Sequence, residues 1–369
     1  MINYTINNTE HKVTFCRSNI YKSISNAVET VKSDKKILLI YDDKIEKKII
    51  NSIHSELKLS GCKIYSLKIK GDKFNKNEKY LFKILDFLIQ NKFTKRSVVF
   101  SCGGGVVGDV AALASSLYLR GTIYFSIPST MTAIVDSAIG GKTGINYKGI
   151  INSLGTYYHP KNVFILEDII SSIPNREYTA GFSEIIKCGL IDNKQILKYL
   201  EKNKNSILKR NFTNLSKLCE LTLKSKIKLF KDDVYENKNR LILNFGHTFA
   251  HAIEMAIENE IKKDFIRHGE AVALGILCEI FYSKRGKSSI FEFSKKLFKL
   301  FGLPIFLDFK NLKLNKTKII NDIHQNIFLD KKRISAYPRY ISLKKQGKPK
   351  IEEIKDFDFI NDTILKVLF

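Results

Sequence analysis

Three histidines that lie close together in the sequence form the clearest chemical pattern. Of the seven histidines in the chain, His247, His251 and His268 fall within one short region. His247 and His251 are four residues apart in NFGHTFAHAIE, so a helix would place both on one face. His268 opens the segment HGEAVALG, ahead of a helix of small residues. Because imidazole is a common ligand of zinc and similar cations, the pattern predicts a divalent metal site.

A carboxylate further upstream is a candidate for the same ligand set. Glu184 lies in GFSEIIKCGL, and Lys187 follows one turn along the same helical face. Two imidazoles and one carboxylate leave coordination positions open, which is typical of catalytic metal sites. The HExxH motif of zincin proteases is absent. The spacing alone does not show which histidines bind the metal. It also leaves open the alternative that these are ordinary helical histidines without a metal.

A glycine-rich segment, GGGVVGD at 103–109, follows the apolar run SVVFSC and precedes a second helix of small residues. It fits G-x-G-x-x-G at a strand-to-helix turn, where backbone N–H groups can approach a pyrophosphate. Unlike an ordinary Rossmann fingerprint, it follows the third predicted strand, and no acidic residue ends the next strand. The alternative is a tight turn that only packs the helix against the sheet.

The elements that must position these residues differ between the two halves of the chain. In the first half we expect strands buried on both faces at 36–41, 63–69, 97–102, 124–129 and 163–168, helices at 43–60, 77–92 and 107–120, and an edge strand at 11–15. This alternation predicts a doubly wound, mostly parallel, Rossmann-like sheet.

After about residue 173, helical periodicity dominates the sequence. Helices are expected at 176–190, 206–231, 240–258, 268–284 and 287–300, and the only extended segment is expected at 337–344. The prediction is therefore an α/β N-terminal domain of residues 1–172 and a mainly α-helical C-terminal domain of residues 173–369.

Composition excludes several classes of protein. The net charge is +25, but the lysines are spread along the whole chain rather than gathered in one patch. This distribution predicts a solvated basic surface that attracts small anions. It does not predict a nucleic-acid partner. No apolar run is long enough to cross a membrane. The six cysteines form no C-x-x-C pair, as is typical of the reducing cytoplasm, where we expect the protein.

Several segments resemble, in order and approximate spacing, the signature segments of the 3-dehydroquinate synthase family. They are GGGVVGD, YLRG, IPST, VDSAIGGKTGIN, EIIKCGLI, RLILNFGHTFAHAIE and RHGEAVALG, with a fainter echo at DKK (330–332). The resemblance implies a dehydroquinate synthase-like fold with an NAD-binding domain and a helical domain that binds metal and substrate. It also implies conversion of 3-deoxy-arabino-heptulosonate 7-phosphate to 3-dehydroquinate and phosphate, in the shikimate pathway, with transient reduction of NAD.

The resemblance assigns roles residue by residue. A zinc or cobalt ion would be bound by Glu184, His247 and His268, and His251 would assist a proton transfer. NAD would contact Asp42, Gly104, Gly105, Val106, Asp109, Ser129 and Thr130. Substrate hydroxyls would contact Asp136, Lys187 and Asn244, and the substrate carboxylate Lys226 and Arg240. The phosphate would meet Lys142, Asn152, one of Lys331 and Lys332, and Arg120, which would reach across the interface of a homodimer.

The sequence departs from the family pattern in three places. The family's Gly-Lys-Asn is replaced by Ile150-Ile151-Asn152, so a phosphate-site lysine is missing. The family's G-E-x-x-K becomes Gly71–Asn75, and the second glycine of G-H-T-F-G-H is Ala250. We expect either that Lys148 replaces the missing cation or that phosphate binds more weakly.

The departures leave three alternatives open. One is another sugar phosphate cyclase, for example one that acts on sedoheptulose 7-phosphate. The second is a metal-dependent polyol or glycerol-phosphate dehydrogenase of related fold, which would release NADH. The third is a binding protein without catalytic activity.

Overall fold

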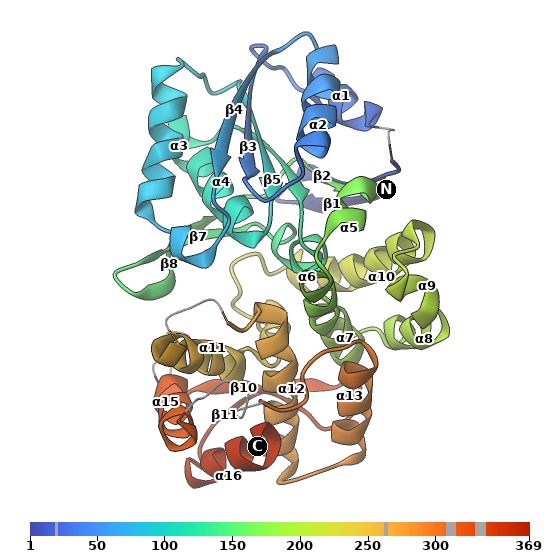
Figure 1. Ribbon diagram of the computed structural model, residues 1–369, viewed down its shortest axis with the longest axis vertical. Helices are drawn as coiled ribbons and strands as arrows, with labels where there is room; N and C mark the ends of the chain where they lie inside the picture. Colours follow the sequence, from blue (N-terminus) through green and yellow to red (C-terminus); the bar gives the residue numbers. More distant parts are fainter. Residues whose placement is uncertain (19–20, 262–264, 308–314, 329–336) are drawn as a thin grey trace. The chain divides into compact units, whose positions relative to one another are not determined.

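The computed structural model describes residues 1–18, 21–261, 265–307, 315–328 and 337–369 (Figure 1). The chain forms two compact units. The first unit consists of Met1–Pro174 and Lys209–Tyr235, and the second of Asn175–Leu208 and Glu236–Phe369. The domain boundary at residues 172 and 173 stays a prediction. The compact units also show that the segment Lys209–Tyr235 packs with the N-terminal part of the chain.

A seven-stranded sheet in the order β1-β2-β9-β6-β5-β3-β4 forms the centre of the first unit. Its strands are β1 (Ile2–Ile6), β2 (Thr9–Cys16), β3 (Lys36–Asp42), β4 (Lys63–Ile69), β5 (Val98–Gly103), β6 (Ile123–Pro128) and β9 (Asn162–Leu166). β1 is antiparallel to β2, and every other neighbouring pair is parallel. The predicted doubly wound, mostly parallel sheet is confirmed.

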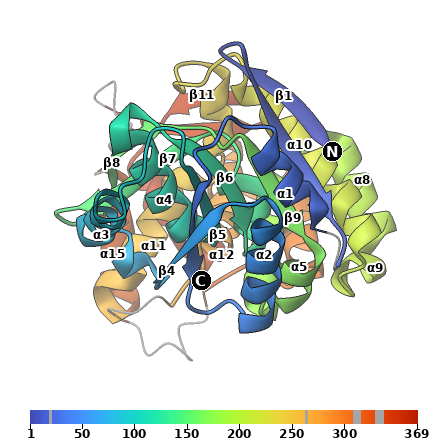
Figure 2. The ribbon, with the colours of Figure 1, turned by 90° about the horizontal axis from the view of Figure 1, so that it is seen from above.

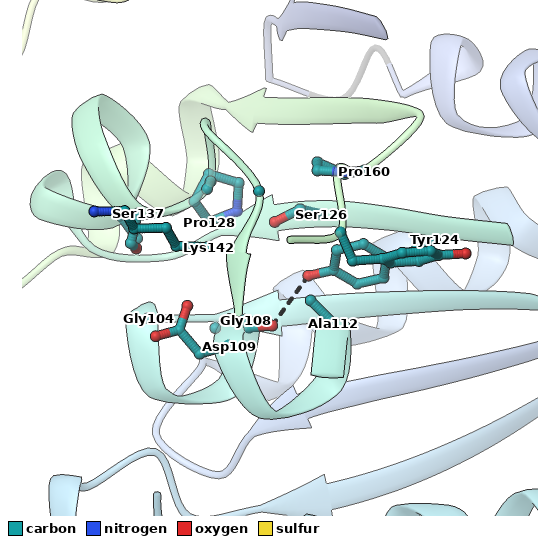
Figure 3. Close-up of a pocket in the computed structure, with 15 residues that line it drawn as sticks. Gly104, Gly108, Asp109, Ala112, Tyr124, Ser126, Pro128, Ser137, Lys142 and Pro160 are labelled. Atoms are coloured by element: carbon teal, nitrogen blue, oxygen red, sulfur yellow. Dashed lines mark hydrogen bonds between the residues drawn. The ribbon is translucent and has the colours of Figure 1, made fainter. Parts of the chain in front are cut away.

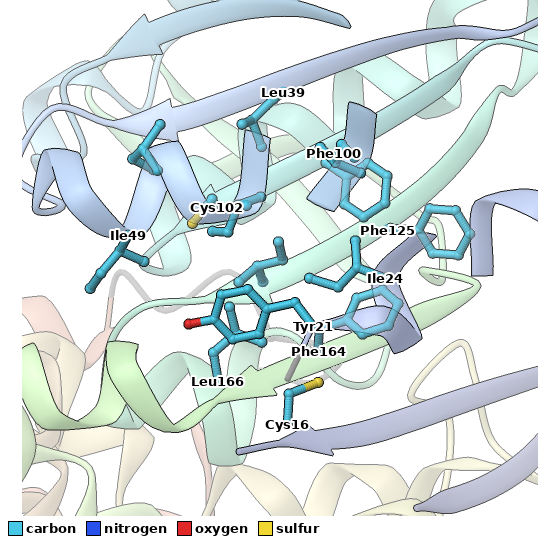
Figure 4. Packing of buried hydrophobic residues seen from close by; sticks show 14 of the residues in the cluster. Cys16, Tyr21, Ile24, Leu39, Ile49, Phe100, Cys102, Phe125, Phe164 and Leu166 are labelled. Atoms are coloured by element: carbon cyan, nitrogen blue, oxygen red, sulfur yellow. The ribbon is translucent and has the colours of Figure 1, made fainter. Parts of the chain in front are cut away.

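Helices cover both faces of this sheet: α1 (Lys22–Glu29) and α2 (Lys47–Leu59) on one face, α3 (Glu78–Gln90) and α4 (Gly105–Leu117) on the other. The alternation of side chains along β3 shows why. Ile37 and Leu39 pack with α1 and α2 in one core cluster, which Figure 4 shows. Leu38 and Ile40 pack with α3 and α4 in the other. A strand covered on both faces is apolar throughout, and this continuous apolar run allowed β3 to be predicted from the sequence.

The sequence missed some elements of this unit and misjudged one. β4 was expected to be buried on both faces, which is wrong, because β4 is an edge strand with a largely exposed or half-buried beginning. The hairpin of β7 (Lys142–Tyr147) and β8 (Ile150–Tyr157) was not predicted, nor were β1 and α5 (Glu167–Ser172). Helix α10 (Phe212–Phe230) also belongs here and lies beside β1, with Phe230 against Tyr4 (Figure 2).

The second unit is mainly helical, as predicted. Its helices are α6 (Asn175–Ala180), α7 (Phe182–Ile191), α8 (Lys194–Lys202), α9 (Lys204–Leu208), α11 (His247–Ile261), α12 (His268–Lys284), α13 (Ser289–Leu300), α15 (Lys316–Phe328) and α16 (Asp358–Leu368). The expected extended segment is β10 (Arg339–Leu343), and it pairs with an unpredicted strand, β11 (Pro349–Glu353). α12 is buried along nearly its whole length and forms the centre of the unit. Among the described residues, no helix is long and apolar enough to span a membrane.

Candidate active-site clusters

The predicted metal ligands come together in the second unit. Glu184 lies in the first turn of α7, while His247 and His268 are the first residues of α11 and α12. One ligand atom from each of the three lies within 4.8 Å of the others. The Nε2 atoms of both histidines are 3.8 Å from the same oxygen, Glu184 Oε1. Separations of this size suit three ligands of one divalent cation at ordinary ligand distances of about 2.0–2.2 Å.

The surroundings of the three ligands orient them toward one point. His247 Nδ1 lies 3.2 Å from the carbonyl oxygen of Phe245, and His268 Nδ1 lies 3.2 Å from Glu254 Oε1. A hydrogen bond from Nδ1–H leaves the Nε2 lone pair available to a metal. The Glu184 carboxylate is only 1 % exposed, and its other oxygen, Oε2, forms an ion pair with buried Lys187. A buried carboxylate facing two imidazole nitrogens has the donor chemistry that a divalent cation requires.

Glycines adjacent to the ligands allow this convergence. Gly246 has φ +85°, and a Cβ there would lie 2.5 Å from Ile276 Cγ1 of α12. A Cβ on Gly275 would overlap the carbonyl oxygen of Gly246, and one on Gly269 would overlap that of Ala180, just before α7. Close backbone approach at these points therefore brings the beginnings of α11 and α12 to Glu184.

Other predicted residues of the second unit lie near this cluster. The His251 ring centroid is 5.5 Å from that of His247 and 6.1 Å from that of His268, so His251 stands beside the ligands. Arg240 and Asn244 belong to the short helix η4 (Asn239–Asn244), which directly precedes α11. Arg240 is buried, and Asn244 Nδ2 donates a hydrogen bond of 2.6 Å to Glu236.

The predicted NAD residues lie at the carboxyl edge of the sheet in the first unit. Asp42 ends β3 and Gly103 ends β5, and these strands are parallel neighbours. The chain passes from β3 to β4 on one side and returns to β5 on the other, so this edge is a topological switch point, where open α/β sheets bind ligands. Ser129, just after β6, donates its N–H to Gly103 O at 2.8 Å. Thr130 follows and lies against Gly104.

The glycines of the turn differ in what they do. Gly104 caps α4, and Gly105 and Val106 form its first turn. A Cβ on Gly103 would lie 2.5 Å from Val107 Cβ, so this glycine is required for packing of the helix. A Cβ on Gly108 would meet no described atom within 4 Å. The packing alternative therefore explains Gly103 but not Gly108.

A pocket opens beside this turn (Figure 3). Gly104, Gly108, Asp109 and Lys142 line it, and the Tyr124 hydroxyl in its wall donates a hydrogen bond to Gly108 O. Burial raises the pKa of the Asp109 carboxyl, and the neighbouring Lys76 ammonium opposes that shift. The pocket therefore combines bare backbone with charged side chains, a lining suited to a polar anionic ligand.

Asp136 and Lys226 are paired with each other. Asp136 lies in η3 (Ala133–Ser137), a π-helical segment, a form often found at functional sites. Lys226 Nζ, on α10, lies 2.5 Å from both the carboxylate Oδ1 and the carbonyl oxygen of Asp136. Residues expected to contact different groups of the substrate thus meet in the first unit.

The remaining predicted residues are more exposed. Arg120 lies in an exposed turn with φ +62°, and Asn152 lies in the exposed part of β8. Lys331 and Lys332 fall outside the described residues.

Sequence reasoning missed two neighbours of the site. One is Glu254, three residues after His251 on the same helical face. The other is Lys76, which contacts Asp109 and Asn152.

Comparison with known proteins identifies the family of the chain. Residues 66–180 match the family model for the 3-dehydroquinate synthase N-terminal domain, and residues 181–333 match that for the C-terminal domain. The chain is 33% identical to a 3-dehydroquinate synthase of Clostridium tetani over 335 residues, 90% of this chain and 83% of the relative. It is 31% identical to that of Ruminiclostridium cellulolyticum over 99% of both chains.

A solved structure is similar in fold at lower identity. It is a 2-epi-5-epi-valiolone synthase of Streptomyces hygroscopicus with NAD+ and Zn2+ bound, with a TM-score of 0.84, 19% identity and 99% coverage of both chains. The chain shares its fold with this enzyme and with a 2-deoxy-scyllo-inosose synthase (TM-score 0.81, 21% identity). Within this fold, the chain belongs to the 3-dehydroquinate synthase family.

Proposed function

We propose that the protein is a 3-dehydroquinate synthase that converts 3-deoxy-arabino-heptulosonate 7-phosphate to 3-dehydroquinate and phosphate. The observation that carries the proposal is the convergence of Glu184, His247 and His268, in a chain whose relatives carry this name over most of their length. The six cysteines of the chain are all free thiols, in keeping with a cytoplasmic enzyme of the shikimate pathway.

The second unit would hold the metal and manage proton transfer. Glu184, His247 and His268 would bind the cation, and Lys187 would hold the Glu184 carboxylate in place through its second oxygen. His251 stands beside these ligands, where an imidazole can accept or return a proton. When bound, zinc or cobalt lowers the pKa of hydroxyl groups on the substrate, and NAD accepts a hydride and returns it.

The first unit would hold NAD and the anionic groups of the substrate. Backbone N–H groups at Gly104, Gly105 and Val106, at the beginning of α4, suit the pyrophosphate, and Asp42 suits the nucleoside end. Ser129, Thr130 and Asp109 border the same region.

Each unit, taken by itself, carries side chains whose chemistry suits a group of the substrate. From the first unit, Lys142 and Asn152 serve the phosphate, with Asp136 and Lys226 as a preformed charged pair. From the second, Arg240 and Asn244 contribute a guanidinium for the carboxylate and an amide for a hydroxyl.

Incubation of the metal-loaded protein with NAD and candidate sugar phosphates tests the proposal. We expect phosphate release and the mass of 3-dehydroquinate with the heptulosonate phosphate and no turnover of sedoheptulose 7-phosphate. The reverse preference, or no release with either compound, would contradict the proposal.

We also infer a homodimer in which Arg120 serves the partner's phosphate site. Leu119 and Arg120 both have positive φ in a turn before Gly121, and Leu117 and Leu119 are about half exposed. This conformation presents apolar side chains and a guanidinium outward together, as an interface requires.

Mixing two inactive variants tests the role of Arg120. If Arg120 acts across the interface, mixed dimers of Arg120→Ala and His268→Ala contain one complete site each. Random mixing should then restore roughly one quarter of wild-type activity. No recovery, in a mixture shown by native mass spectrometry to contain mixed dimers, would contradict the inference.

A further inference from the structure

The segment between β4 and α3 connects three of the predicted ligand-contacting residues of the first unit. At its beginning, Gly71 lies so close to Asp42 that a Cβ would overlap the carboxylate. Asp72 accepts hydrogen bonds from the N–H of Asn75, at 3.1 Å, and from its side-chain amide, at 2.6 Å. At its end, Lys76 O accepts a bond of 2.8 Å from Asn146 N in β7. The segment is therefore fixed at both ends.

The side chain of Lys76 connects the other two residues. Its Nζ lies 2.5 Å from Asp109 Oδ2 and 2.5 Å from Asn152 Oδ1. The Lys76 side chain is 12 % exposed, so the ammonium is held in place and partly shielded from water. An ammonium carries three N–H donors, and contacts with the described residues use two of them. One donor therefore remains for a ligand beside the pocket that Asp109 lines.

Lys148, expected from the sequence to compensate for Ile151, lies elsewhere on the hairpin. It is exposed at the turn between β7 and β8, with φ +47°, and its Nζ lies 5.6 Å from the centroid of the Tyr147 ring. A surface cation over a single ring is weakly held. Lys76, by contrast, is hydrogen-bonded to Asn152, the retained neighbour of the missing lysine.

We propose that Lys76 supplies the cation that position 151 lacks and binds a phosphoryl group at the edge of this pocket. The inference rests on the proposed function for its ligands, since the phosphoryl group is either the pyrophosphate of NAD or the phosphate of the substrate. Asp109 and Asn152 hold the ammonium in place before the ligand arrives, and this lowers the entropy lost on binding.

Binding measurements on the metal-loaded, full-length protein test this proposal. Calorimetry gives the Kd of NAD and of inorganic phosphate, and kinetics gives the KM of the substrate. Lys76→Met should weaken phosphoryl binding by roughly 10- to 100-fold, because it removes a charge-assisted hydrogen bond. Lys76→Arg should retain most of the affinity. Lys148→Met, the matched control, should change each constant by less than about threefold.

The pattern of losses identifies the ligand. Weaker NAD binding alone assigns Lys76 to the pyrophosphate, while weaker phosphate binding and a raised KM assign it to the substrate. If Lys76→Met lowers only the melting temperature and leaves every constant within about twofold of wild type, Lys76 is a structural residue and the proposal is wrong. NAD and phosphate binding need no turnover, so failure of the proposed function would leave this test intact.

Discussion

The proposed metal cluster of the second unit and the proposed phosphoryl-binding region of the first are built in different ways. The metal ligands stand at the beginnings of helices that approach backbone to backbone through Gly246, Gly269 and Gly275. The phosphoryl-binding side chains come instead from strand ends, a hairpin and a loop, and several are exposed, among them Lys142 and Asn152. One cluster is fixed by helix packing, whereas the other depends on side-chain hydrogen bonds.

The departures from the family pattern are distributed according to this difference between the two regions. Ile151 and the Gly71–Asn75 segment lie in the first unit, where we propose that Lys76, from another loop, supplies the missing cation. In the second unit the change is Ala250 for glycine, which is fully buried and adds only a methyl group. A cluster formed by close backbone contact tolerates little change, while a cluster of long side chains can exchange one residue for another.

The largest effect is expected from removal of a metal ligand. His268→Ala should abolish bound metal and turnover, because only two of the three proposed ligands remain. The fold should survive, because the side chain that is lost is partly exposed. Metal content by mass spectrometry and circular dichroism check this, with His54→Ala on α2 as the control. Full metal occupancy in the His268 variant would refute the ligand assignment.

A matched pair of glycine substitutions sharpens the contrast between helix packing and ligand binding. Gly275→Ala should destabilise the protein by about 1–3 kcal/mol, because the methyl group overlaps the Gly246 carbonyl. Gly108→Ala, in helix α4, should leave stability unchanged or raise it by up to about 1 kcal/mol, because the new Cβ meets open space.

Chemical denaturation measures the stability of both variants, and NAD titration measures their affinity for the cofactor. Gly108→Ala should still weaken NAD binding if the cofactor approaches this glycine. Unchanged NAD affinity in Gly108→Ala, or unchanged stability in Gly275→Ala, would show that the corresponding glycine is not needed for close approach.

A smaller effect is expected at Glu254, which contacts a metal ligand rather than the metal. Glu254→Ala should weaken metal binding by about 10- to 100-fold, because His268 loses the carboxylate that orients its ring. Glu254→Gln, which keeps an acceptor oxygen, should recover part of that loss. Competition with a chelator measures both affinities, and equal affinities in the wild type and Glu254→Ala would exclude the orienting role.

The parts of the molecule that were predictable from the sequence share a physical cause. The strands covered on both faces were visible because their sequences are continuously apolar, and the ligand helices because of their small residues and histidine spacing. The β7–β8 hairpin was missed because β8 is exposed along most of its length and β7 has only a short buried run of three residues. Lys76 was missed because its partners lie 33 and 76 residues away in the chain. The position of α10 was missed because amphipathic periodicity does not specify which neighbour a helix packs against.

The most direct test of the central claim is the amount of NAD consumed per product formed. We propose a cyclase that reduces NAD and reoxidises it within each turnover, so NAD at a small fraction of the substrate concentration should support complete conversion. Phosphate release would then reach the substrate concentration with no lasting absorbance of NADH at its characteristic wavelength. If product formation instead stops when NAD is exhausted, and NADH accumulates in equal amount, the protein is a dehydrogenase and the account is wrong.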